Sequence, residues 1–66
     1  MQFIPKRDAQ SGDRVREVGH YAQIDDMPRV TRLDAASGLF VIDGTGERLV
    51  PFDRVDAVVR VIVVPR

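Results

Sequence analysis

Residues 39–52 read LFVIDGTGERLVPF and contain two short apolar segments separated by a glycine-containing turn. The first segment, residues 39–42, is entirely apolar, and Asp-Gly with a further glycine at position 46 follows it. Asp-Gly readily adopts the positive φ angles that a tight hairpin needs, so residues 43–46 are typical of a turn between antiparallel strands. Residues 47–52 form the predicted return strand.

The preceding segment extends this hairpin by one strand. Residues 35–38 read AASG, which is typical of a second turn, and residues 29–34 form a further strand candidate before it. Pro28 fits the start of that strand, because its missing N–H is harmless there. We therefore predict a three-strand antiparallel meander over residues 29–52.

The segment after the meander predicts one helical turn and a last strand. Asp53 is a suitable cap for a turn over residues 53–55, and residues 56–64 are rich in valine, which fits a pleated sheet. The run Val-Ile-Val-Val at residues 61–64 favours the strand. A helix is the competing interpretation, because four apolar residues recur at helical spacing: Val55, Val58, Val59 and Ile62.

The first half of the chain allows two interpretations. Residues 13–18 fit a strand with Val15 facing inward, or the start of a helix that runs from Ser11 to Ile24 and is weakened by Gly19. We predict the strand. Residues 1–11 are expected to form a flexible N-terminal arm, and residues 12–66 a single small domain.

Composition bounds the class of protein. A chain of 66 residues forms one domain at most and buries only about 60% of its unfolded surface. The apolar content of 44% is too high for a disordered chain, and without cysteine there are no disulfides or thiolate metal sites. Ten basic and ten acidic residues argue against a simple polycation for nucleic acid. With no signal peptide and no apolar run near about 20 residues, we expect a cytoplasmic protein without a membrane partner.

Residues 12–16 read GDRVR, and residues 49–55 read LVPFDRV. The first resembles the opening strand of prokaryotic SH3-like small barrels, including KOW-type modules. The second resembles the end of such barrels, where a strand passes through a proline into a 3₁₀ turn and then into the last strand. The resemblance covers roughly residues 12–60. It implies an all-β fold, a small five-stranded SH3-like barrel with one 3₁₀ turn before the last strand.

One family with this type of barrel, the plasmid-borne type II dihydrofolate reductases, is enzymatic and has a similar opening strand. These proteins build one active pore from a tetramer and use a Val-Gln-Ile-Tyr run before the proline. The matching place here, residues 49–52, reads LVPF and lacks the glutamine and the tyrosine. The resemblance therefore does not imply reductase activity.

Side chains capable of catalysis or metal binding are few. Ser11 and Ser37 each precede a glycine, as in ordinary turns, and His20 is the single histidine. His20 with Asp25 and Asp26 has no metal-ligand spacing and is typical of an exposed loop. We therefore expect no catalytic residue, no metal and no cofactor. An enzyme whose site is shared between subunits ranks third among the candidate functions.

Nucleic-acid binding is the alternative function. Small barrels can bind single strands through a basic groove with stacking aromatic side chains. Residues 1–32 carry six basic and five acidic residues, so the local excess is one positive charge. The candidate contacts are four arginines: Arg14, Arg16, Arg29 and Arg32.

Both faces of the predicted last strand are apolar. One face carries Ala57, Val59, Val61 and Val63, which we assign to the core. The other face needs a cover, because an exposed apolar strand invites pairing. The cover is a second copy of the chain, another protein, or the arm through Phe3 and Ile4. We predict a homo-oligomer or an adaptor module acting through an interface of four residues: Val58, Arg60, Ile62 and Val64.

Overall fold

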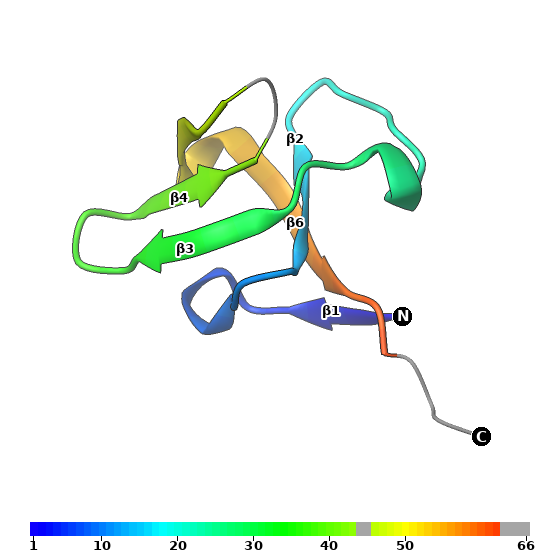
Figure 1. The fold of residues 1–66 in the computed structure, drawn as a ribbon, viewed down its shortest axis with the longest axis horizontal. Helices are drawn as coiled ribbons and strands as arrows, with labels where there is room; N and C mark the ends of the chain where they lie inside the picture. The colour runs from blue at the N-terminus through cyan, green and yellow to red at the C-terminus, as the bar shows by residue number, and fades with distance from the viewer. Residues whose placement is uncertain (44–45, 63–66) are drawn as a thin grey trace.

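The computed structural model describes residues 1–43 and 46–62, and these residues form two three-stranded antiparallel sheets (Figure 1). The first sheet has the order β1-β6-β2, with β1 (Gln2–Ile4), β2 (Arg14–Glu17) and β6 (Val55–Arg60). The second has the order β3-β4-β5, with β3 (Val30–Asp34), β4 (Leu39–Ile42) and β5 (Arg48–Pro51). Three short 3₁₀ turns connect them: η1 (Lys6–Asp8), η2 (Ile24–Asp26) and η3 (Phe52–Arg54). The all-β prediction is confirmed.

The second sheet is the predicted meander. Phe40 on β4 lies opposite Leu33 on β3 and Val50 on β5. The turn from β3 to β4 ends at Gly38, whose φ of +67° suits glycine better than residues with a Cβ atom. Residues 44–45 of the second predicted turn lie outside the described residues. Short apolar segments and turn chemistry therefore predict this sheet correctly.

The first sheet is built around β6, which is a strand and not a helix. The strand assigned to residues 13–18 is also confirmed, as β2. The register between these strands shifts: Arg16 pairs with Ala57, but the next residue, Glu17, pairs with Val55. Asp56 is thus the extra residue of a β-bulge, and a bulge reverses the alternation of the strand that contains it.

The structure corrects the predicted facing of the last strand. Val58 was expected on the outer face, but it is 1% exposed and packs in the core, as does Val55 three residues earlier. Val59, expected inside, belongs to the opposite face. The prediction was wrong because it assigned the wholly apolar face of the strand to the core, whereas Val58 lies opposite the buried Val15 of β2 and shares its face. Val61, also expected inside, is 53% exposed, and Val63 lies outside the described residues.

The N-terminal segment is part of the fold, not a separate arm. Phe3 of β1 pairs with Val59, and Ala9 enters the core. The Nζ of Lys6 donates a hydrogen bond to the carbonyl oxygen of Phe52. Residues 1–43 and 46–62 therefore form six strands, where the sequence predicted five.

Removing residues 1–8 is expected to lower the free energy of unfolding by about 2–4 kcal/mol, since a net hydrogen bond contributes about 0.5–1.5 kcal/mol and the deletion removes the β1 ladder and the Lys6 contact. Urea denaturation followed by circular dichroism measures the change. A truncated chain as stable as the full one would show that β1 contributes nothing to the fold.

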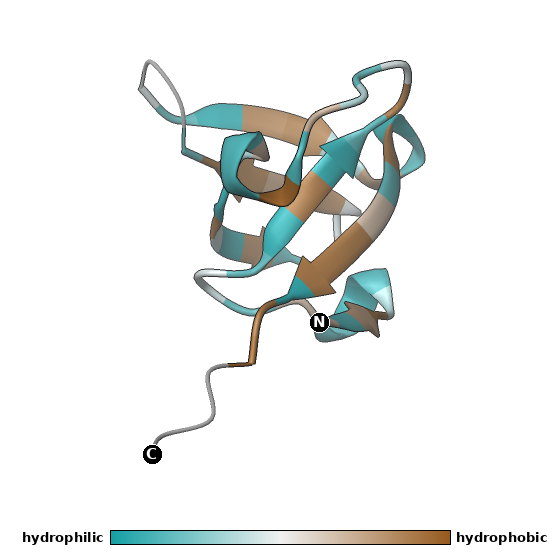
Figure 2. Ribbon diagram, turned by 90° about the vertical axis from the view of Figure 1, so that its right-hand side faces the viewer, coloured by the Kyte–Doolittle hydropathy of each residue, from teal (hydrophilic) through white to brown (hydrophobic). Residues whose placement is uncertain are grey.

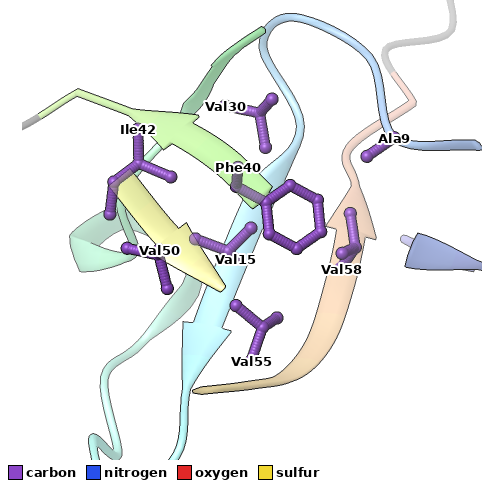
Figure 3. Close-up of a cluster of buried hydrophobic side chains, with 8 residues drawn as sticks. All are labelled: Ala9, Val15, Val30, Phe40, Ile42, Val50, Val55 and Val58. Carbon is purple, nitrogen blue, oxygen red and sulfur yellow. The ribbon is translucent and has the colours of Figure 1, made fainter. Parts of the chain in front are cut away.

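The core lies between the two sheets (Figure 3). Backbone hydrogen bonds join the sheets at one side, where Gly12 donates to Val30 and Val30 donates back to Asp13. The Val18 N–H donates to the Arg54 carbonyl, which continues the β2–β6 pairing within the first sheet. The buried apolar cluster enclosed in this way consists of Ala9, Val15, Val30, Phe40, Ile42, Val50, Val55 and Val58.

Candidate protein interface

Four large apolar side chains are more than half exposed at the end of the first sheet where β1 begins and β6 ends. Figure 2 shows this end, where β6 is hydrophobic before its last residue, Arg60, and the hydrophobic residues directly after it lie close to the N-terminus. We call this set the terminal patch: Met1, Phe3, Val61 and Ile62.

The pairing of β1 with β6 brings the terminal patch together. Phe3 lies directly opposite Val59, and cross-strand partners share a face of a sheet. The neighbouring pair, Ile4 and Val58, packs on the core side. Phe3 therefore lies on the face turned away from the core and is 68% exposed, although its partner Val59 is buried.

The structure separates the four predicted interface residues. Val58 is enclosed in the core and has no surface to offer a partner. Arg60 is bound within the chain, Ile62 belongs to the terminal patch, and Val64 lies outside the described residues.

Arg60 forms the centre of a polar clamp that ties three segments together. Its Nε donates to Oδ1 of Asp13 at 2.8 Å, and its Nη2 donates to Oδ2 at 2.9 Å. Nη2 also donates to the Asp8 carbonyl at 3.3 Å, and the Gln10 N–H donates to Oδ2 of Asp13. Arg60, predicted as an interface residue, thus finds its carboxylate partner within the chain itself.

Asp13 is the buried member of this clamp, with 3% of the residue exposed. Burial of the carboxylate raises the pKa of Asp13, but the hydrogen bonds from Arg60 and Gln10 outweigh it, so the pKa lies below its usual value of 3.8. Asp13 is therefore ionised near neutral pH and holds β2 to the end of β6.

Sequence reasoning missed Phe3 and Met1 as members of the exposed terminal patch. The N-terminal segment was treated as a possible cover for the last strand, whereas it pairs with the edge of that strand and extends the exposed apolar surface. The only sequence feature that could have indicated β1 was the apolar pair Phe3-Ile4 before Pro5. Two residues are too few to show the alternation of a strand.

The four arginines proposed for nucleic acid do not form one free basic surface. Arg14 donates to the carbonyl oxygens of Asp25 and Met27 and so holds the loop before β3. The Nε of Arg16 lies 4.0 Å from Oδ2 of Asp56. Arg29 and Arg32 are exposed, so only half of the predicted set remains uncommitted.

Among the residues that the structure describes, no group of three or more His, Cys, Asp or Glu side chains could hold a metal ion. His20 is exposed in the loop after β2. In the same part of the chain, no helix has the length and hydrophobicity needed to cross a membrane.

No family model, curated protein or solved structure matches this chain.

Proposed function

We propose that this chain is a non-enzymatic small β-barrel of the SH3-like type that acts through protein contacts, and that it assembles with copies of itself through the terminal patch. The succession β2-β3-β4-β5-η3-β6 supports the barrel type, because it matches the strand order and the 3₁₀ turn that the resemblance implies. In this proposal β1 is an additional strand on the outer side of β6.

The observation that carries the proposal is the exposure of the terminal patch in a chain with so small a core. Fully burying a large apolar side chain is worth about 1.5–3 kcal/mol. Phe3, Val61 and Ile62 are 68%, 53% and 55% exposed, so covering them contributes about 3–5 kcal/mol per subunit. A domain of this size has a stability of only about 3–10 kcal/mol. Assembly thus supplies stabilisation of the same order as folding.

A second copy fits this surface because β1 is an edge strand. The outer backbone groups of β1 have no partner strand among the described residues, and an edge strand with exposed apolar side chains favours pairing with another chain. A two-fold axis beside β1 would place the same patch on both sides of the interface, as in most homodimers.

Phe3→Asp and Ile62→Asp are expected to convert the assembly into folded monomers, since each places a charge in the apolar interface. Light scattering on a sizing column measures the mass, and circular dichroism checks the fold. Tyr21→Asp is the matched control, because Tyr21 is 95% exposed in a loop away from the patch and should leave the mass unchanged. Unchanged mass in both patch variants would contradict the proposal, and unfolded variants would show that these residues belong to the core.

A further inference from the structure

A shallow groove of about 530 Å³ lies between β5 and the end of β2, away from the terminal patch. Glu17, Val18 and His20 line one side, and Leu49, Pro51 and Arg54 line the other. Leu49 is 65% exposed and Val18 is about half exposed, so the groove presents aliphatic surface to solvent.

The backbone of β5 offers unpaired hydrogen-bonding groups along this groove. The Phe52 N–H donates to the Gly38 carbonyl, so Gly38 and Phe52 form a hydrogen-bonded pair of the β4–β5 ladder. Every second pair of an antiparallel ladder is hydrogen-bonded, so Phe40 and Val50 form the next such pair. In an antiparallel ladder the residues between such pairs direct their backbone groups away from the partner strand. The N–H and C=O of Leu49 and the C=O of Pro51 therefore point away from β4, on the free edge of the sheet.

The charges of the groove are unbalanced. Nη2 of Arg48 donates to the Glu17 carboxylate at 2.8 Å, so the one acidic group is neutralised. Arg54 is exposed, and its guanidinium makes no hydrogen bond or ion pair with any residue in the described part of the chain. The net positive charge left at Arg54 complements a carboxylate.

We propose that this groove binds an extended segment of a partner protein that carries an acidic side chain next to aliphatic ones. The segment adds to β5 as a further strand, exchanging backbone hydrogen bonds with Leu49 and donating one N–H to the Pro51 carbonyl. An aliphatic side chain packs on Leu49 and Val18, and the carboxylate pairs with Arg54. This binding does not depend on assembly through the terminal patch.

The probe is a capped pentapeptide of alternating valine and glutamate, titrated into the ¹⁵N-labelled full chain. The amide signals of Val18 and Leu49 are expected to shift in a saturable manner, and the affinity should fall with added salt. A pentapeptide of alternating valine and lysine is the charge-reversed control and should cause no saturable shift. Equal binding of both peptides, or no shift of these two amides, would overturn the proposal.

Two variants separate the charge from the backbone contribution. Arg54→Glu reverses the exposed charge and is expected to weaken binding of the acidic peptide by about tenfold. Leu49→Pro removes the outward N–H of residue 49 and leaves the β4–β5 hydrogen bonds in place, because that N–H points away from β4. Proline is tolerated at such a position of an edge strand. Leu49→Ala keeps the N–H and is its control. If Leu49→Pro binds as tightly as Leu49→Ala, the peptide does not bind as a strand.

Discussion

Replacing Phe40 with alanine is expected to lower the free energy of unfolding by about 3–5 kcal/mol, the usual cost of removing a buried phenylalanine ring. Phe40 is fully buried at the middle of β4, and its ring centroid lies 4.6 Å from that of Phe52. The ring is the largest side chain in the core and contacts residues from both sheets (Figure 3). Because the whole domain has only about 3–10 kcal/mol of stability, the variant should lose a large fraction of it and unfold at a much lower urea concentration.

Urea denaturation followed by circular dichroism measures this effect. Tyr21→Ala is the matched control, because it removes a ring of similar size that is almost fully exposed, and it should change stability by no more than about 0.5 kcal/mol. A Phe40→Ala variant within about 1 kcal/mol of the wild type would show that the two sheets do not enclose a common core around this ring.

The second large effect is expected at the polar clamp. Asp13→Ala should lower the free energy of unfolding by about 2–3 kcal/mol, because it removes three hydrogen bonds to a buried carboxylate. The loss lies below that of a fully buried pair, since the Arg60 side chain is 31% exposed and can regain water when Asp13 is absent. The double variant with Arg60→Met should recover part of the loss, because it leaves no unpaired charge.

The same clamp makes stability depend on pH. The pKa of Asp13 is lowered in the folded chain, so its contribution is fully present above the unfolded value of about 3.9 and is lost as the pH falls through the folded value. The stability difference between wild type and Asp13→Ala should therefore shrink as the pH is lowered from 7 to below about 3. A difference that stays constant over this range would contradict the assignment of an ionised Asp13 bound to Arg60.

The parts of the fold that follow local rules were predictable from the sequence. The meander of residues 29–52 is defined by short apolar segments and by turn glycines, and η3 follows Pro51 as the resemblance implies. These features depend on residues that are neighbours in the chain, so a single sequence contains the information for them.

The parts that depend on distant residues were not predictable in this way. The pairing of β6 with β2 places Val58 opposite Val15 in the core, and the same register contains the bulge at Asp56. The strand β1 has only three residues and exists because the edge of β6 is available to pair with it. Arg14 and Arg60 were interpreted as contacts for partners, but groups far along the chain, at residues 25–27 and at Asp13, bind them.

The proposed assembly uses residues near β1 as well as the end of β6, whereas the predicted interface lay on the last strand alone. Only Ile62 of the predicted residues lies exposed among the described residues, and Phe3 and Met1 join it through the β1–β6 pairing. The general expectation of an uncovered apolar surface near the end of the chain led toward this region, while the particular residues depended on a strand that the sequence pattern does not reveal.

The solution mass of the wild-type chain, measured by light scattering on a sizing column over a range of concentrations, tests the proposed self-assembly most directly. We predict a defined multiple of the chain mass of 7.4 kDa, equal to two chains for a two-fold interface at β1. A mass of one chain at every concentration would contradict it and would leave the terminal patch without a second copy to cover it.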